Sequence, residues 1–319
     1  MTDISAQFEA DAGRGDASLG DYMKLLKPRV MSLVIFTALA GIAAAPGTSH
    51  PVLGLAILIC IAVGAGAAGS LNMWYDADID AQMARTVGRP VPTGKVEPGE
   101  ALALGIGLSL LSVPLLALFG NIAAAAFLAF TIFFYAVIYT IYLKRATPHN
   151  IVIGGLAGAF PPAIGWLAVT GDLSVTPLLM VLIIFLWTPP HFWALALFRS
   201  GDYARVDVPM LPVVAGHAAT RRQIWWYSVL LAIVAVVPSF TVAGGPIYLL
   251  VSIVASLWFV RDAWRVSRRD EVAAKADRHA AEKRLFATSI IYLFAVFGAF
   301  IADAVLRSLI GPFGWPVLL

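Results

Sequence analysis

The side chains best placed for chemistry in this 319-residue chain are three polar residues at the end of an apolar stretch. Asn72, Asp76 and Asp80 are spaced four residues apart, so a continuing helix would present all three on one face. Carboxylates held this close repel one another unless a cation neutralises them. Oxygen ligands without histidine or cysteine favour Mg²⁺, which is typically shared between a few carboxylates and phosphate groups. The spacing therefore predicts a site for Mg²⁺ and a phosphorylated substrate; the alternative is a solvated, charged helix end.

Basic and acidic residues elsewhere extend this pattern. Arg85 and Arg89 stand a few residues beyond Asp80, and their guanidinium groups are suited to bidentate binding of phosphate oxygens. A second acidic segment, with Asp202 and Asp207, follows a later apolar stretch. Acids on both sides of a bound diphosphate would hold metal ions there as a leaving group departs. An ordinary loop of mixed charge is the alternative for this second segment.

The composition indicates which elements must position these residues. Hydrophobic residues make up 60% of the chain and charged residues 13%, whereas soluble domains have about 45–50% and about 25%. A spanning helix needs about 20 mostly apolar residues. Nine stretches meet this need: 30–46, 52–74, 101–119, 121–143, 151–170, 175–198, 224–243, 245–264 and 287–309. We therefore predict an all-α polytopic membrane protein with nine transmembrane helices, which excludes a soluble enzyme, a secreted disulfide scaffold and a disordered regulator.

The basic residues predict the orientation in the membrane. Of the 22 Lys and Arg residues, 21 fall in the N-terminal segment or in alternate connections, and only Arg307 falls on the other side. Under the positive-inside rule the basic side is cytoplasmic, so the N-terminus is expected inside and the C-terminus outside. Both acidic segments share this cytoplasmic side. The net charge of +3 thus reflects orientation in a bilayer, and no nucleic acid partner is expected.

The ends and connections carry a few further expectations. Residues 1–20 hold four acids and one arginine and lack the apolar region of a signal peptide, so we expect a disordered cytoplasmic tail. Residues 21–319 are expected to form a single domain. In the charged stretch 265–284 we expect a helix on the membrane surface. The lone cysteine, Cys60, permits no internal disulfide.

Taken together, these features resemble the UbiA-type intramembrane prenyltransferases. The first motif of that superfamily, Asn-x-x-x-Asp-x-x-x-Asp, is met by Asn72, Asp76 and Asp80. Over nearly the whole chain, the sequence is most similar to the protohaem IX farnesyltransferases, the haem O synthase family. An ordered set of segments carries this similarity: 22–30, 72–80, 85–90, 139–148, 150–155, 161–166, WTPPHFW at 187–193, and 202–212 with VPMLP at its end.

The resemblance implies a fold and a reaction. The fold is nine transmembrane helices around a central cavity, in a bacterial plasma (inner) membrane, with the active site at the cytoplasmic face. The reaction transfers the farnesyl group of farnesyl diphosphate to a vinyl group of protohaem IX, with Mg²⁺ as cofactor, and water completes the side chain of haem O. Haem A synthase or the assembly of a terminal oxidase would then receive the product.

The resemblance also implies roles for individual residues. Catalytic positions are matched by Asn72, Asp76, Asp80 and Asp202, with Asp76, Asp80 and Asp202 as metal ligands. Positions around the diphosphate are matched by Arg29, Arg85, Arg89, Tyr139, Lys144 and Asn150. The second motif of the superfamily usually places acids four residues apart, whereas residue 206 is Val here, so the role of Asp207 stays open.

One histidine and several aromatic residues in the apolar stretches are candidates for a role in the same chemistry. His191 follows Pro189 and Pro190 within an apolar stretch, where a broken backbone is able to line a cavity. It could ligate haem iron or handle a proton near the vinyl group, and a structural histidine is the alternative. Aromatic faces suit an allylic cation, although aromatic residues also gather at membrane interfaces, which is the favoured alternative for most of them. The candidates are Trp74, Tyr75, Phe133, Phe134, Tyr135 and Tyr139.

Two other functions stay open. The chain could be a related UbiA-type prenyltransferase that acts on a quinone precursor or on chlorophyllide, but the segments at 187–193 and 208–212 argue against this. It could also be a membrane transporter. Transporters usually place charged groups near the bilayer midplane, whereas here the charges gather at one face. This distribution favours an enzyme that acts at the membrane interface.

Overall fold

A computed structural model describes residues 17–47, 50–311 and 314–318 of the chain. Within these residues every regular element is a helix. In this part of the chain, eight spans are long and apolar enough to cross a membrane. A ninth is added if Leu19–Leu25 and Pro28–Ala44, which meet at 54°, count as one bent span. The protein is therefore an all-α, multi-pass membrane protein, as the composition predicts.

The spanning helices follow the predicted stretches. In chain order they are α3 (Pro28–Ala44), α4 (Pro51–Tyr75), α6 (Pro98–Phe119), α7 with the π-helix η1 (Ile122–Phe133, Phe134–Leu143), α9 with α10 (Asn150–Ala159, Pro161–Thr170), α11 (Val175–Phe198), α14 with the 3-10 helix η2 (Gly216–Val236, Val237–Phe240), α15 (Pro246–Ser267) and α17 (Ala280–Ile310). Both α14 and α17 begin before the predicted starts at 224 and 287, because polar turns continue these helices beyond their apolar parts.

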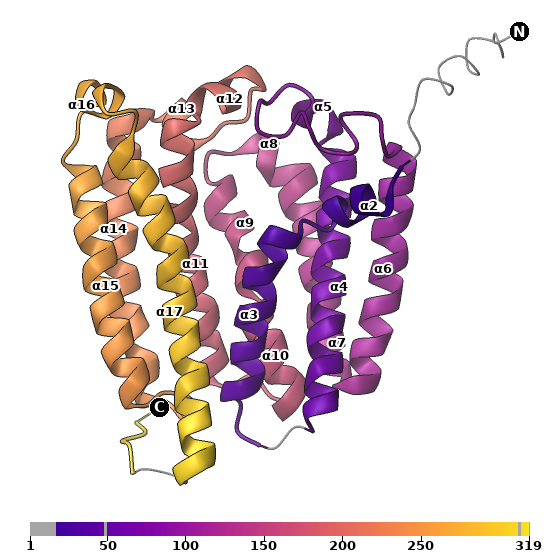
Figure 1. Ribbon diagram of the computed structural model, residues 1–319, viewed down its shortest axis with the longest axis vertical. Coiled ribbons are helices and arrows are strands. Elements are labelled where there is room, and N and C mark those ends of the chain that lie inside the picture. Colours follow the sequence, from indigo (N-terminus) through magenta and orange to yellow (C-terminus); the bar gives the residue numbers. More distant parts are fainter. Residues whose placement is uncertain (1–16, 48–49, 312–313, 319) are drawn as a thin grey trace, which may run out of the picture.

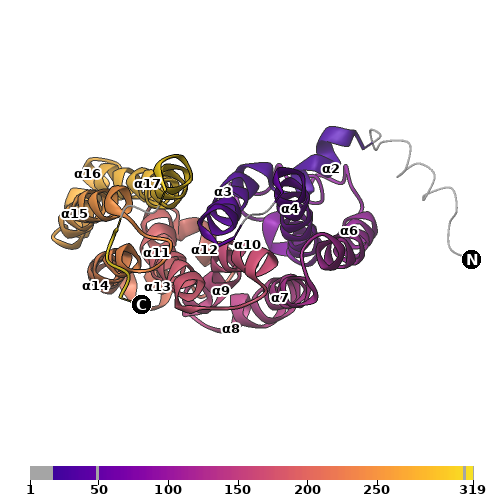
Figure 2. The same ribbon diagram turned by 90° about the horizontal axis from the view of Figure 1, so that it is seen from below.

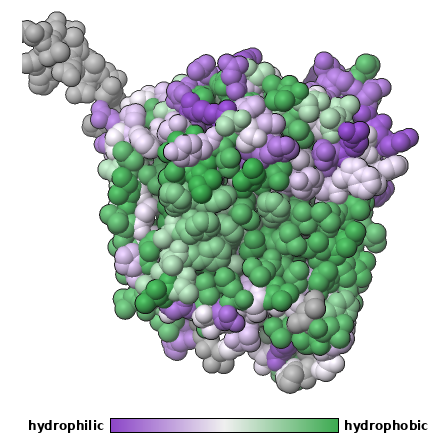
Figure 3. Space-filling view, turned by 180° about the vertical axis from the view of Figure 1, so that it is seen from behind, coloured by the Kyte–Doolittle hydropathy of each residue, from purple (hydrophilic) through white to green (hydrophobic). Residues whose placement is uncertain are grey.

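Short helices gather at one end of the bundle, which we call the polar end (Figure 1). They are α5 (Ala77–Asp80), α8 (Lys144–Ala146), α12 (Ser200–Arg205), α13 (Leu211–Val214) and α16 (Glu271–Ala276). Figure 3 shows hydrophilic residues concentrated at this end, above a broad apolar band. Both acidic segments of the sequence belong to it, through α5 and α12. The compartment that the polar end faces stays a prediction.

Two expected local structures differ from the observed ones. Residues 1–16 of the expected tail lie outside the described residues, and α2 (Leu19–Leu25) already begins before the predicted boundary at residue 20. It does so because Ser18 and Asp21 form a reciprocal capping box. The prediction of one surface helix over 265–284 is wrong. Positive φ angles at Arg278 and His279 separate α16 from α17, and the stretch is divided among α15, α16 and α17.

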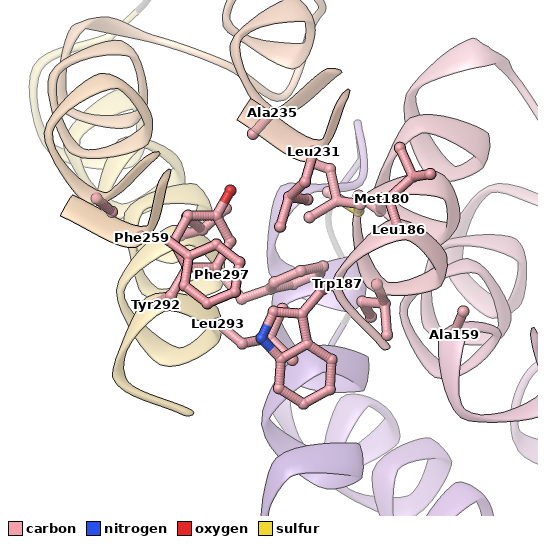
Figure 4. Packing of buried hydrophobic residues seen from close by; sticks show 14 of the residues in the cluster. Ala159, Met180, Leu186, Trp187, Leu231, Ala235, Phe259, Tyr292, Leu293 and Phe297 are labelled. Atoms are coloured by element: carbon pink, nitrogen blue, oxygen red, sulfur yellow. The ribbon is translucent and has the colours of Figure 1, made fainter. Parts of the chain in front are cut away.

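Viewed along the helices, the bundle is a curved row with α14, α15 and α17 toward one end and α4 and α6 toward the other (Figure 2). Each side has its own apolar core. The larger core joins α11, α14, α15 and α17, where Trp187 packs with Leu293 and Phe297 (Figure 4). A second core joins α4, α7 and α10. These packed cores hold the polar-end connections in fixed positions.

Close helix contact in the middle of the row depends on glycine. A Cβ atom on Gly41 of α3 would lie 2.0 Å from the carbonyl oxygen of Pro162 in α10, and one on Gly165 would lie 2.5 Å from the oxygen of Ala38. Neither distance is compatible with a side chain, so these glycines allow α3 and α10 to touch backbone to backbone.

The end of the bundle away from the polar end has its own buried carboxylate. Asp303 of α17 is fully buried, and its Oδ2 accepts a hydrogen bond at 2.8 Å from the backbone N–H of Tyr248, in the first turn of α15. Its Oδ1 accepts from the backbone N–H of Ile247 at 3.3 Å. Arg307 donates to the carbonyl oxygens of Ala243 and Gly244. These residues bind α17 to the start of α15 and have a structural role.

Candidate functional site

The three motif residues Asn72, Asp76 and Asp80 lie at the junction of α4 and α5. Helical hydrogen bonds bridge this junction, from Asp76 N to Asn72 O at 3.0 Å and from Asp80 N to Asp76 O at 2.8 Å. The four-residue spacing therefore survives although α4 ends at Tyr75. The side-chain amide of Asn72 donates to Asp76 Oδ2 at 2.6 Å and to Thr140 Oγ1 at 3.0 Å. All three motif side chains are buried at the polar end.

Basic side chains from two other segments neutralise these acids. Lys144, at the start of α8, donates to Asp76 Oδ2, and Arg89 pairs with Asp80 Oδ2. Because these cations come from the α5–α6 connection and from α8, the pairing joins segments that are far apart in the sequence. The arrangement brings together the positive charge that a diphosphate needs and the carboxylates that a metal needs.

Lys27 enters this cluster through the bend between α2 and α3. It has a left-handed φ of 53°, directly before Pro28, and its Nζ donates to Asn72 Oδ1 at 2.5 Å. Gly69 on α4 makes room for the bend, since a Cβ there would lie 3.2 Å from the carbonyl oxygen of Leu25. The ammonium group also lies 5.9 Å from the centre of the Tyr135 ring. This bend thus places a positive charge beside the motif asparagine.

On the outward side of α5, Arg145 binds Asp78 through two hydrogen bonds of 2.7 Å each. The hydrogen bond from this guanidinium holds the pKa of Asp78 below its usual value, against a smaller opposing effect of partial burial. The same guanidinium stacks on Tyr75 at 5.1 Å. Asp78 is exposed, so this pair holds α5 against α8 at the rim of the site rather than inside it.

Several buried oxygen atoms in the site lack a hydrogen-bond partner. They are Asp76 Oδ1, Asn150 Oδ1 and Asp202 Oδ2. A buried carboxylate oxygen without a hydrogen bond is costly unless something binds it. In the ranges 17–47, 50–311 and 314–318, no three Asp, Glu, His or Cys residues gather closely enough to hold a metal ion by themselves. Mg²⁺ usually takes only one or two carboxylates and completes its shell with water and phosphate oxygens, so the donor set fits Mg²⁺ together with a diphosphate.

The second acidic segment lies next to the first. Tyr203 of α12 is buried with Ile79 and Met83 of the first segment and with Met210 in one apolar cluster. Asp202 is largely buried, and Arg199 and Arg205 lie 4.0 and 3.9 Å from its carboxylate oxygens. The structure therefore connects α12 to α5, although no hydrogen bond joins the two sets of acids among the described residues. Asp207 has a left-handed φ of 51° in the loop after α12.

The π-helix η1 places further predicted residues in the site. Its wider turn lets the side-chain hydroxyl of Thr140 donate to the carbonyl oxygen of Tyr135, five residues earlier, at 2.8 Å. The rings of Tyr135 and Tyr139 lie 5.4 Å apart. Gly154 of α9 accommodates Tyr139, since a Cβ at this glycine would lie 2.0 Å from the ring. Such a bulge is common at functional sites because it turns side chains out of the regular helical register.

Of the other predicted phosphate-binding residues, Asn150 joins the cluster and two arginines stay outside it. Asn150 is buried at the start of α9, and its Nδ2 donates to the carbonyl oxygen of Lys144 at 3.1 Å. Arg29, in the first turn of α3, and Arg85, after α5, are both exposed. Neither pairs with an acid of the cluster in the part of the chain that the structure describes.

His191 lies apart from the acids, between α11 and α17. Its ring is stacked between Trp187 at 4.3 Å and Phe286 at 4.6 Å. Its Nδ1 lies 2.6 Å from Ser289 Oγ, and that hydroxyl donates to the carbonyl oxygen of Phe286 at 2.6 Å. The Ser289 oxygen therefore accepts from Nδ1–H, and this leaves a lone pair on Nε2 of the neutral ring.

Sequence reasoning did not assign a role to several residues of the site. Lys27 belongs to a matched segment, but nothing local indicates that it reaches Asn72, 45 positions later. The contacts of Thr140 and Ser289 likewise depend on neighbouring helices. For Lys27, the Lys-Pro step was the available signal, because a residue before proline is disfavoured in the helical conformation and marks a bend.

Buried acids paired with basic residues, at one end of a helical membrane bundle, are typical of an intramembrane enzyme. The sequence model of the UbiA prenyltransferase family matches residues 33–290. The chain belongs to this family.

Relatives and solved structures agree with this membership. Proteins named protoheme IX farnesyltransferase are 57% identical over 315 residues in Ruegeria pomeroyi (97% of this chain, 99% of that protein), and 58% identical over 301 residues in Dinoroseobacter shibae (94% and 96%). A digeranylgeranylglyceryl phosphate synthase structure has a TM-score of 0.70 at 19% identity, covering 90% of this chain and 99% of its own. A UbiA homolog from Archaeoglobus fulgidus, bound to DMAPP and Mg²⁺, has a TM-score of 0.60 at 18% identity, covering 88% and 99%. At these identities the structures show a common fold.

Proposed function

We propose that this protein transfers the farnesyl group of farnesyl diphosphate to a vinyl group of protohaem IX and so makes haem O. The observation that carries the proposal is the high identity, over nearly the whole chain, to proteins named protoheme IX farnesyltransferase. The polar-end site adds independent support, since it combines a buried carboxylate cluster with lysine and arginine side chains.

Asp76, Asp80 and Asp202 are the residues that would hold Mg²⁺ in this site. The oxygens of Asp76 and Asp202 that accept no hydrogen bond support this assignment, as does the Mg²⁺ bound with DMAPP in the Archaeoglobus fulgidus homolog. When bound, Mg²⁺ neutralises the charge of the departing diphosphate. Asn72 holds the Asp76 carboxylate in place through its 2.6 Å hydrogen bond.

Positive side chains bind the diphosphate. Lys27, Arg89 and Lys144 already lie around the acids. Each would also donate hydrogen bonds to phosphate oxygens when the substrate enters. Arg29, Arg85, Tyr139 and Asn150 complete the proposed set, with the exposed arginines closing over the substrate from the rim.

The chemistry begins when the allylic C–O bond breaks and its electron pair leaves with the diphosphate. The vinyl π electrons then bond to C1 of the farnesyl group, and water captures the resulting cation and releases a proton. The faces of Tyr135 and Tyr139 stabilise positive charge beside the diphosphate. An interior without other water is required, because water would capture the farnesyl cation first.

His191 supports a porphyrin as the acceptor. Its Nε2 carries a free lone pair, and the ring is held by two aromatic faces and one serine. An immobilised neutral imidazole of this kind is a suitable axial ligand for haem iron. Handling of a proton near the vinyl group would use the same nitrogen.

Location and partners belong to the same proposal. The enzyme would reside in the bacterial inner membrane with its polar end toward the cytoplasm, as the basic residues predict. Residues 21–319 would act as one domain, and haem A synthase or the assembly of a terminal oxidase would take up the product.

The decisive experiment incubates the purified protein in lipid with protohaem, farnesyl diphosphate and Mg²⁺, and analyses the product by mass spectrometry. We expect haem O, and no product after removal of Mg²⁺ by a chelator. If a quinone precursor or chlorophyllide is prenylated instead, the acceptor is wrong. Transport of a solute without any prenylated product would overturn the enzyme assignment.

A further inference from the structure

A row of side chains leads from His191 to the polar end, between α11 and α17. Phe286 of α17 stacks on His191, and Phe198 of α11 meets Phe286 edge-on with ring centres 6.2 Å apart. Lys283 ends the row, with its Nζ 5.9 Å from the centre of the Phe198 ring. We call His191, Phe286, Phe198 and Lys283 the aromatic row.

Helix geometry sets the length of this row. His191 and Phe198 are seven residues apart on α11, so they share a face and lie about 10 Å apart along its axis. Lys283 and Phe286 are neighbours three residues apart on α17. The ammonium group of Lys283 is therefore about two helical turns from the His191 ring, in the direction of the polar end.

The charge of Lys283 is uncommitted, unlike that of nearby basic residues. Arg284 donates to Asp262 at 3.2 Å, and Arg221 pairs with the buried Glu282 at 3.2 Å. Within the residues that the structure describes, no carboxylate lies within ion-pair distance of Lys283, and its ammonium group lies over the Phe198 ring. Its side chain is exposed at the polar end. The row thus offers an imidazole at one end and a free ammonium at the other.

We infer that Lys283 receives a propionate carboxylate of the porphyrin acceptor, an inference that rests on the proposed function. Protohaem carries its two propionates on one edge and its two vinyl groups on the opposite edge. A carboxylate is costly in the hydrocarbon of the bilayer, so the propionate edge must reach the polar end. With iron at Nε2 of His191, an extended propionate spans the distance to Lys283, and the macrocycle lies along Phe286 and Phe198.

This placement orients the reacting edge. Lys283 belongs to α17, on the side of the bundle away from α4 and the acid cluster (Figure 2). A propionate held there turns the opposite edge, with its vinyl groups, away from Lys283 and into the apolar interior of the bundle. Lys283 is thus a specificity-determining residue that selects an acceptor with an anionic edge and determines which edge enters the apolar interior.

The test compares protohaem with its dimethyl ester, which keeps the iron and the vinyl groups but lacks the carboxylates. Binding of each to the protein in lipid nanodiscs is followed by the shift of the Soret band, and turnover with farnesyl diphosphate is measured in parallel. The variants are Lys283→Met, Lys283→Arg, and Lys275→Met as a matched exposed lysine elsewhere on the polar end.

We expect Lys283→Met to weaken protohaem binding about tenfold, the size of one charge-assisted hydrogen bond, and to leave binding of the ester and the KM for farnesyl diphosphate unchanged. Lys283→Arg should restore most of the affinity, and Lys275→Met should behave as the native protein. Equal effects of Lys283→Met on both porphyrins, or none, would overturn the inference while haem O formation persists. Loss of the proposed function itself would show differently, as a native protein that neither shifts the Soret band nor forms haem O.

Discussion

At the scale of single residues, Asp76 has the most informative surroundings. One oxygen of its fully buried carboxylate accepts from Asn72 and Lys144. The other accepts no hydrogen bond within the described residues, and its nearest cation is the Arg145 guanidinium at 3.9 Å. A group whose only role was structural would be expected to satisfy both oxygens, since a buried unpaired acceptor is destabilising. The carboxylate is therefore positioned for a ligand.

Replacement of Asp76 by asparagine tests this position. Asp76→Asn keeps the size of the side chain but removes the charge that a metal–diphosphate complex needs. We expect turnover to fall by at least about a hundredfold, the effect of losing one preorganised electrostatic contact, with little change in the unfolding temperature. Steady-state kinetics and thermal unfolding in detergent measure the two quantities.

Asp78→Asn is the matched control for this variant, because it removes an equal charge from the exposed side of the same short helix. It should retain nearly native turnover. If both variants lose activity equally, general charge around α5 matters and the particular position of Asp76 does not. If Asp76→Asn stays active, the metal site is assigned wrongly.

At the scale of elements, the position of the η1 π-helix against α9 depends on the absence of a side chain at Gly154. A Cβ on Gly154 would lie 2.0 Å from one ring carbon of Tyr139 and 2.4 Å from another. The ring is therefore seated directly on the backbone of α9. Since α9 also begins with the buried Asn150, this contact positions two of the predicted phosphate-binding residues together.

Gly154→Ala should displace the Tyr139 ring. We expect kcat to fall by up to about a hundredfold, because small displacements of positioning groups have effects of that size, and stability to fall by about 1–3 kcal/mol through overpacking. Gly158→Ala on the same helix meets no atom within 4 Å and should leave both quantities unchanged. Unaltered kinetics in Gly154→Ala would show that the Tyr139 ring has no part in the site.

At the scale of the whole molecule, the apolar cores and the charged site occupy different levels along the helix bundle. Two packed cores fill the apolar part of the bundle, and hydrophilic residues gather at the polar end (Figure 3). The polar end also contains the buried oxygens of Asp76, Asn150 and Asp202 that lack a hydrogen bond. A charged diphosphate can therefore stay near water while the prenyl chain and the porphyrin occupy apolar surroundings. This division requires that the polar end faces the compartment that supplies the diphosphate.

Cysteine labelling tests that orientation. In a Cys60→Ala background, Lys95→Cys introduces a thiol at an exposed position of the α5–α6 connection, and Asp172→Cys introduces one in the exposed turn between α10 and α11. A membrane-impermeant maleimide should label residue 172 from the periplasmic side and residue 95 only in inverted vesicles, as the positive-inside rule requires. The opposite labelling pattern would invert the predicted topology.

By itself, the sequence determined the helical membrane class, the positions of the spans, the one-sided distribution of charge and the motif Asn72, Asp76 and Asp80. These properties are local, because hydrophobic length and four-residue spacing are set by the bilayer and by the pitch of a helix. Only the tertiary structure decided which cations meet those acids. Lys27 and Asn72 are 45 positions apart, and His191 and Ser289 are 98 apart. Such contacts arise from helix packing around glycines and bends, and this packing depends on the shapes of distant surfaces that local spacing does not encode.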